Sequence, residues 1–224
     1  MSTGQSEISG PIVFGDSLGR FDAQSTVWSA TSRDGVQIVE HHARCILMVE
    51  KNSIFKRLLA DKFPAKNQCI LATDGGYPGR SFRKLLHKIE QQTRLPFYVL
   101  ADNDPAGYEF FFLIVRGGLA KNPREQASAI PGAAYLGLLN SDFESMKLHD
   151  DVTIKLTPDE RQQLDRLLSY AWLPAGSPWR SEINAMQKRG FKVEMEATAS
   201  LSIDYLAEHF LPQRLASANH LRLA

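Results

Sequence analysis

Three acidic residues directly follow short apolar runs, and acids in such positions can bind a divalent metal. Glu50 follows the run at residues 45–49, and Asp102 and Asp104 lie at the end of the run at 97–101. In a parallel sheet, ligands bind beyond the carboxyl ends of the strands, where the loops converge. Three carboxylates without histidine or thiolate make a hard oxygen site, suited to Mg²⁺ that keeps several waters and meets its substrate through phosphate. The pattern indicates a candidate magnesium site.

Each acid has a simpler interpretation beside the metal one. Glu50 suits a solvated strand end. Asp104 precedes Pro105, so it suits the N-cap of a helix with proline in its first position. Asp102 is harder to explain in this way, because Asp104 already serves that helix.

A helix predicted over residues 80–93 carries basic side chains along one face and apolar side chains along the other. An ordinary solvated helix has the same pattern. Beside a carboxylate site, the basic face would instead bind a phosphate backbone. The residues of this face are Arg80, Arg83, Lys84, His87 and Lys88.

From residue 44 the chain alternates short apolar runs with amphipathic stretches, which is typical of a parallel α/β sheet flanked by helices. The third run leads into residues 108–115, which are apolar on nearly every side and are predicted to form a buried helix. The predicted strands are residues 45–49, 68–73 and 97–101, and the helices between them are residues 53–62 and 80–93.

The two flanks differ from this core. Residues 1–43 are predicted to form a short β segment, and residues 141–224 a helical extension packed on the core at residues 44–140. Thr157 and Glu160 have the spacing of a capping box. The predicted flanking strands are residues 11–14, 25–28 and 36–39, another strand is residues 133–138, and the helices of the extension are residues 158–170, 178–189 and 194–210.

Composition narrows the class of protein further. The 224 residues carry 26 Lys and Arg against 25 Asp and Glu and are 43% hydrophobic, which predicts a folded globular protein. A net charge of +1 argues against a purely electrostatic nucleic-acid coat, though not against a DNA enzyme with bases on one face. The longest apolar run, at residues 110–115, is far shorter than the roughly 20 residues of a membrane span. Cys45 and Cys69 suit reduced core residues, so an intracellular location is expected, in the nucleoid or the nucleus according to the organism.

Several local strings resemble the TOPRIM domain found in the A subunit of topoisomerase VI and in the related meiotic double-strand-break proteins. The resemblance extends from about residue 12 to about residue 215, and the fold that it implies is a Rossmann-like TOPRIM sheet. The strings are ILMVEK at 46–51, TDGGYP at 73–78, LADNDPAG at 100–107, VTIKLT at 152–157, YAW at 170–172 and VEMEA at 193–197.

The resemblance implies a function in type IIB DNA cleavage. It assigns Glu50, Asp102 and Asp104 as Mg²⁺ ligands beside a DNA backbone that a tyrosine attacks, with the metal acting as a Lewis acid. Lys51 and Arg80 would contact that backbone. The expected partners are duplex DNA, a second copy of the chain and an ATPase subunit of the B type.

The chain departs from the family pattern in one respect. The family's nucleophilic tyrosine lies on a winged-helix domain before the TOPRIM domain, and only about ten residues precede the matching region here. We therefore expect either a fragment or a reduced member that needs a tyrosine-bearing partner and is inactive in cleavage alone.

Two other functions compete with this one. A haloacid-dehalogenase-like phosphatase also uses a DxD motif, with the first aspartate as nucleophile. That family places the motif on its first strand and has Thr or Val where this chain has Ala106. A non-catalytic assembly module could keep the fold, although clustered carboxylates that repel one another have no physical need in an idle site.

Overall fold

The computed structural model describes residues 6–17, 19–30, 35–119, 122–146, 148, 150–217 and 220–223. The chain divides into two compact units. Unit 1 comprises Met1–Leu100 and Leu113–Ala133, and unit 2 comprises Ala101–Phe112 and Ala134–Ala224. Strands and helices alternate through unit 1, which confirms the predicted mixed α/β fold class. The division into segments 1–43, 44–140 and 141–224 stays a prediction.

Three parallel strands form the centre of unit 1. β6 (Cys45–Val49) lies between β7 (Cys69–Thr73) and β8 (Phe97–Leu100). Every residue of these strands is buried, which explains why their sequences are apolar throughout instead of alternating. β1 (Glu7–Ser9) extends the sheet antiparallel to β7, and β4 (Trp28–Ser29) pairs with β1.

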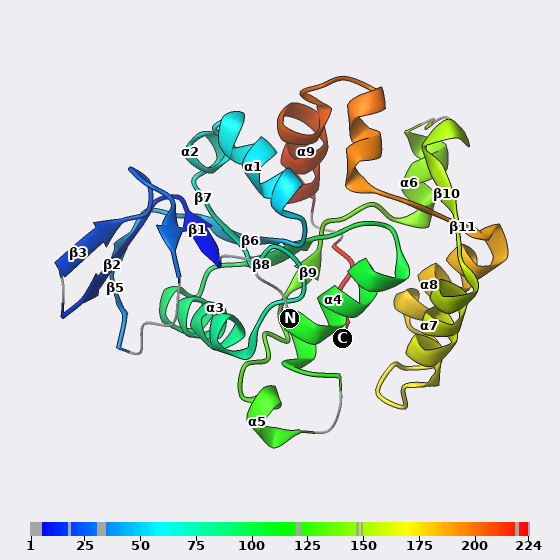
Figure 1. Ribbon diagram of the computed structural model, residues 1–224, viewed down its shortest axis with the longest axis horizontal. Helices are drawn as coiled ribbons and strands as arrows, with labels where there is room; N and C mark the ends of the chain where they lie inside the picture. Colours follow the sequence, from blue (N-terminus) through cyan, green and yellow to red (C-terminus); the bar gives the residue numbers. More distant parts are fainter. Residues whose placement is uncertain are drawn as a thin grey trace. The chain divides into compact units, whose positions relative to one another are not determined.

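Helices cover both faces of the unit 1 sheet. Figure 1 shows α1 (Asn52–Ala60) and α2 (Phe63–Asn67) on one face and α3 (Arg80–Thr93) on the other. The bounds of α3 are those predicted from its periodicity. A short helix, α5 (Pro123–Gln126), belongs to the same unit.

A small antiparallel sheet precedes the parallel strands. Its order is β3 (Gly19–Asp22), β2 (Ile12–Asp16) and β5 (Gln37–His41). The predicted strands at 11–14 and 36–39 correspond to β2 and β5. The prediction missed β1 and β3, because three or four residues are too few to show an alternating pattern.

The core of unit 2 is a group of aromatic side chains around Trp179, which is fully buried in α8 (Pro178–Arg189). Its ring lies 4.8 Å from that of Phe111 and 5.2 Å from that of Tyr108, both in α4 (Pro105–Arg116). α4 is therefore buried at its apolar side chains, as predicted. It has 12 residues, and no helix among the described residues is long and apolar enough to cross a membrane.

The remaining elements of unit 2 surround a two-stranded antiparallel sheet of β10 (Thr153–Lys155) and β11 (Phe191–Val193). Between these strands lies α7 (Pro158–Ser169), whose N-terminus has the predicted capping box: Glu160 N–H donates to Thr157, and the Glu160 carboxylate accepts from Thr157 N–H. The other elements are β9 (Ala134–Tyr135), α6 (Asn140–Ser145) and the 3₁₀ turn η1 (Asp150–Val152).

The prediction of one helix over residues 194–210 is wrong. The segment contains a 3₁₀ helix, η2 (Met195–Ser200), then a turn, a π-helical turn, η3 (Leu206–Phe210), and α9 (Leu211–Ala216). In η2, the hydroxyls of Thr198 and Ser200 donate to backbone carbonyls three residues earlier. Such side-chain bonds compete with the regular helical ladder, which explains why apolar periodicity alone overestimated the helix.

Candidate functional site

Glu50 leaves the middle of the unit 1 sheet. Its N–H donates to the Leu100 carbonyl at the end of β8 (3.0 Å). On the other side, the Thr73 hydroxyl at the end of β7 donates to the Val49 carbonyl (2.8 Å). The carboxyl ends of the three parallel strands are therefore tied together at the residue before Glu50 and at Glu50 itself.

Asp74, which follows β7, orders the glycine-rich loop that leads into α3. Its carboxylate is 6% exposed and accepts hydrogen bonds from Gly79 N–H (2.5 Å) and from the Ser6 hydroxyl. Gly79 is the N-cap residue of α3 and makes no side-chain cap, so Asp74 supplies a carboxylate near the start of that helix. Sequence analysis did not single out Asp74, because its partner Ser6 is 68 residues away.

The basic face of α3 is only partly exposed. Arg80 and Lys84 are exposed, whereas Arg83 is 7% exposed, and its burial lowers the pKa of the guanidinium. His87 Nδ1 lies 2.8 Å from the Ala129 carbonyl, and the Lys88 ammonium donates to the Val36 carbonyl. The face predicted as one DNA-binding stripe therefore has two exposed bases, and three whose side chains are buried or directed to the protein's own backbone. The DNA contacts, Lys51 at the N-cap of α1 included, stay predictions.

In unit 2, Asp102 and Asp104 are held by backbone groups of the same unit. Asp102 is 3% exposed, and its Oδ1 accepts a hydrogen bond from Met195 N–H (2.7 Å), while its carbonyl accepts from the Tyr135 hydroxyl (2.7 Å). Asp104 Oδ1 accepts from Gly107 N–H (2.6 Å) in the first turn of α4. The capping interpretation of Asp104 is thus confirmed, and both carboxylates are oriented through one oxygen.

Asn103, between the two aspartates, anchors this acidic loop. It exchanges two backbone hydrogen bonds with Val193 of β11, each 3.0 Å long. Its buried side-chain amide donates to the Tyr108 hydroxyl (2.9 Å) and to the Leu138 carbonyl (3.0 Å). A buried amide with both bonds made resists displacement, because an unpaired polar group in the core is costly.

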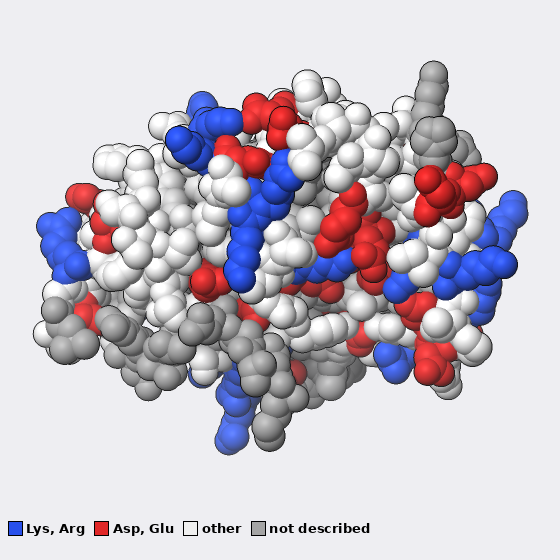
Figure 2. Space-filling view, turned by 45° about the horizontal axis from the view of Figure 1, so that its top comes forward, with Lys and Arg blue, Asp and Glu red and all other residues white. Residues whose placement is uncertain are grey.

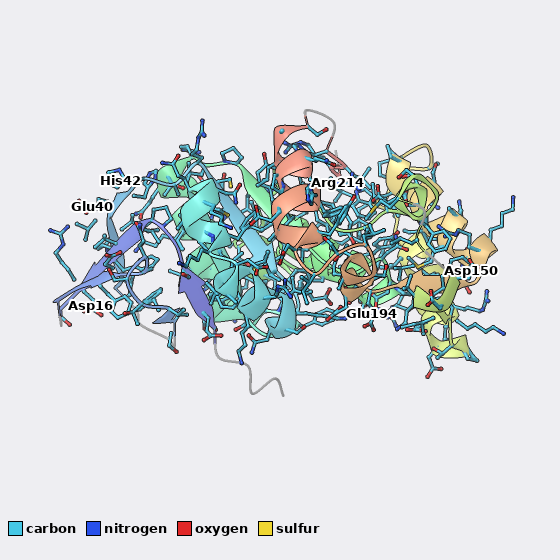
Figure 3. The ribbon with its side chains drawn as sticks, turned by 90° about the horizontal axis from the view of Figure 1, so that it is seen from above. Asp16, Glu40, His42, Asp150, Glu194 and Arg214 are labelled. Atoms are coloured by element: carbon cyan, nitrogen blue, oxygen red, sulfur yellow. The ribbon has the colours of Figure 1, made fainter. Side chains whose placement is uncertain are left out.

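Lys192, which sequence analysis did not select, lies beside the acidic loop. Its ammonium is 2.7 Å from Glu160 Oε1 and 3.9 Å from Asp104 Oδ2. Burial alone would lower the pKa of Lys192, but the bond to Glu160 and the charges of Asp104, Glu160 and Glu194 outweigh it and raise that pKa. Glu194 is labelled in Figure 3, on the segment that joins β11 to η2. The only sequence signal for this arrangement was the VEMEA string at residues 193–197.

The donor chemistry of the acidic loop suits a hard cation. Asp102 and Asp104 bring two carboxylates to one short loop, each already oriented by a backbone N–H. Glu50, the third predicted ligand, belongs to unit 1. In the part of the chain that the structure describes, no three His, Cys, Asp or Glu residues gather as a group that could hold a metal ion. The three-carboxylate ligand set remains a prediction.

Comparison with known proteins identifies the family. Residues 45–215 match the model of a family described as the Toprim domain of Spo11 and of the topoisomerase 6 protein designated A. The chain belongs to this family. The resemblance recognised in the sequence is thereby confirmed, and both the acidic loop and the Lys192 segment lie within the matched Toprim region.

The relatives of this Toprim chain come from eukaryotes and archaea. It is 34% identical to meiotic recombination protein SPO11-1 of Oryza sativa subsp. indica, over 85% of this chain and 50% of the relative. The identity with mouse SPO11 is 32%, over 83% and 47% of the two chains. With the A subunit of the type 2 DNA topoisomerase 6 of Aeropyrum pernix it is 26%, over 83% and 50%. The chain spans about half the length of these relatives.

The close packing of Gly107 against the acidic loop gives a test of how the Toprim aspartates are positioned. A Cβ on Gly107 would meet the Asp102 carbonyl oxygen at 2.4 Å and the Asp102 nitrogen at 3.1 Å. Alanine usually stabilises a helix relative to glycine, but here the contact is with backbone. We expect Gly107→Ala to destabilise the protein by about 1–3 kcal/mol, measured by urea unfolding.

Gly176→Ala is the matched control in the same unit, because a Cβ at Gly176 meets nothing within 4 Å. That variant should unfold within about 0.5 kcal/mol of the wild type. If Gly107→Ala were as stable as Gly176→Ala, the acidic loop would not be confined against α4 in the way described.

Proposed function

We propose that this chain supplies the metal-binding part of a tyrosine-dependent DNA cleavage site of the type IIB class. In this proposal Glu50, Asp102 and Asp104 bind Mg²⁺ next to the backbone of duplex DNA. Relatives in the same family are named as meiotic recombination proteins and as part of a type 2 DNA topoisomerase. Their printed functions support the class of reaction proposed for this chain.

The observation that carries the proposal is the pair of oriented aspartates. Asp102 and Asp104 are nearly buried, yet each presents a carboxylate that backbone N–H groups hold in place. Two like charges on one short loop repel each other, so their retention needs a cation that rewards it. Glu50 follows β6, whose last residue pairs with Leu100, the residue from which the chain enters the acidic loop.

Mg²⁺, when bound, would act as a Lewis acid that withdraws charge from the scissile phosphate. The chain's own residues have a different task. Met195 N–H and Gly107 N–H orient the aspartates, and the Tyr135 hydroxyl fixes the backbone of Asp102. The ligands are therefore positioned before any cation arrives, which lowers the cost of binding.

The nucleophilic tyrosine, in our proposal, comes from a winged-helix domain outside these residues. Tyr108 is fully buried, and burial raises the pKa of its phenol well above the ordinary value. Its oxygen accepts from the amides of Asn103 and Asn140. The Tyr135 hydroxyl donates to backbone carbonyls. Both phenols thus have structural roles, which supports a nucleophile located elsewhere.

The remaining parts of the proposal concern assembly. By analogy with the archaeal topoisomerase relative, whose name marks it as one of several subunits, we propose that the protein acts as a homodimer together with an ATPase subunit of the B type. Its site of action would be chromosomal DNA, in the nucleoid or the nucleus. The isolated chain would bind Mg²⁺ and DNA but would not cleave.

The phosphatase alternative is less compatible with the burial of the acidic loop. There the first aspartate must attack a phosphorus atom, whereas Asp102 is 3% exposed and its Oδ1 is held by Met195 N–H. An aspartate in this setting is better suited to a fixed ligand than to a nucleophile that must reach a substrate.

The first experiment measures Mg²⁺ binding by titration calorimetry on the purified chain. Asp102→Asn and Glu50→Gln should each weaken binding at least about tenfold, because each removes a charged oxygen ligand from the cation. The amide oxygen of Asn can still accept the Met195 N–H, so the fold should persist.

Glu40→Gln and Asp165→Asn are the controls. Glu40 lies on an exposed ion pair of β5, and Asp165 on the exposed side of α7. Both variants should bind Mg²⁺ like the wild type. Equal affinity in Asp102→Asn, Glu50→Gln and the wild type would refute the ligand assignment and favour an assembly module that kept only the fold.

A second experiment tests the DNA surface. On the face in Figure 2, Lys and Arg side chains are interspersed with Asp and Glu, and the coloured residues form no continuous basic surface there. DNA binding should therefore depend on a few residues at the carboxyl end of the sheet. We expect Arg80→Ala with Lys84→Ala to weaken binding of a short duplex about tenfold at low salt, measured by fluorescence anisotropy.

Arg44→Ala is the matched control, because Arg44 is exposed at the opposite, amino end of β6. It should leave duplex affinity within about twofold of the wild type. A loss with Arg44→Ala as large as that with the α3 double variant would mean that binding follows net charge and not position.

A further inference from the structure

Lys192 is placed between two carboxylates in unit 2, and one of them belongs to the acidic loop. Its ammonium makes a short contact with Glu160 Oε1 (2.7 Å) and a long one with Asp104 Oδ2 (3.9 Å). The three side chains are between 14% and 19% exposed. At this level of burial water screens the charges only partly, so each ionic group affects the others strongly.

The backbone determines the distance between Lys192 and Asp104. Lys192 is the central residue of β11 and lies opposite Ile154 of β10. Its neighbour Val193 exchanges two hydrogen bonds with Asn103, the neighbour of Asp104. The lysine and the aspartate therefore extend from residues on either side of one backbone bridge, and neither can leave without breaking it.

Glu160 is held on the other side of the ammonium. Its Oε2 accepts hydrogen bonds from the N–H (2.8 Å) and the hydroxyl (3.0 Å) of Thr157 in the capping box of α7. Its Oε1 is directed to Lys192. A helix N-terminus is the place where a carboxylate is favoured, so Glu160 is an anchor for the ammonium that does not depend on the acidic loop.

We propose that Lys192 is a built-in counter-ion of Asp104. It offsets the negative charge of the acidic loop while no divalent cation is bound, and its ammonium rests on Glu160 alone once a cation occupies Asp104. Lys192 is thus a positioning residue that sets the affinity of the site for the metal. This inference rests on the proposed function above.

The asymmetry of the two contacts supports this role. The shorter contact is with Glu160, so a cation can take over Asp104 without removing Lys192 from its main partner. A positive charge that stays near a metal ligand opposes a divalent cation, which weakens binding. Removal of that charge should therefore strengthen binding, the opposite of what loss of a ligand or of a structural contact would cause.

The test is Mg²⁺ titration of the full chain with Lys192→Met and Glu160→Gln. Lys192→Met should bind Mg²⁺ about tenfold more tightly than the wild type, because one opposing charge is gone. Glu160→Gln should bind several-fold more weakly, because Lys192 is then left with Asp104 as its main partner. Gln preserves the capping-box pattern, so α7 should remain intact.

Lys155→Met is the control, since Lys155 lies in the same two-stranded sheet but is exposed and faces no acid of the loop in the contacts described. Its Mg²⁺ affinity should not change. Unchanged or weaker binding in Lys192→Met, or tighter binding in Glu160→Gln, would overturn the counter-ion role.

A metal-free measurement separates this inference from the proposed function. In a double-mutant cycle of Lys192→Met with Asp104→Asn, the losses of melting temperature should be smaller in the double variant than the sum of the two single losses. Additive losses would overturn the pairing. If the cycle shows coupling while the wild type binds no Mg²⁺, the counter-ion pairing stands and the proposed metal function fails.

Discussion

Two backbone hydrogen bonds between Asn103 and Val193 are the constraint on which the candidate site depends. They join a loop that enters α4 to a strand about 90 residues later in the chain, and they place the residues on either side of each in fixed positions. Asp102 consequently meets the N–H of Met195, and Asp104 meets the ammonium of Lys192. Without this bridge, both aspartates would lie on an unsupported turn.

The bridge also resolves an electrostatic problem. Carboxylates two residues apart and nearly buried would raise each other's pKa and take up protons unless other groups stabilise their charge. Here backbone N–H groups and one ammonium do so. A loop arranged in this way can exchange its ammonium for a divalent cation with little change in the protein, which is the property that a reversible metal site requires.

Much of the fold could be predicted from local pattern. The buried strands β6, β7 and β8 are apolar throughout, α3 has an unbroken amphipathic period, and Thr157 with Glu160 has the spacing of a capping box. Each of these signals lies within about 15 residues of sequence. The family strings, which combine several such signals, were enough to identify the Toprim domain.

The site could be predicted only in part, because its supporting contacts are long-range. The positions of Asp102 and Asp104 follow from the strand end, but nothing local indicates that Met195 or Lys192 meets them. The burial of Arg83 is a similar case: helical spacing assigns it to an exposed face, whereas the fold buries it. The break between η2 and η3 was missed because hydroxyl bonds to the backbone leave no trace in hydrophobic periodicity.

The most direct test of the metal site is a crystal structure of the chain grown with Mn²⁺, in which anomalous scattering locates the ion without reference to any variant. The account predicts one strong peak within about 2.5 Å of carboxylate oxygens of Asp102 and Asp104, with Glu50 as the third protein ligand and Lys192 in contact with Glu160 alone. A strong peak at other residues, with Lys192 still placed between Glu160 and Asp104, would contradict it.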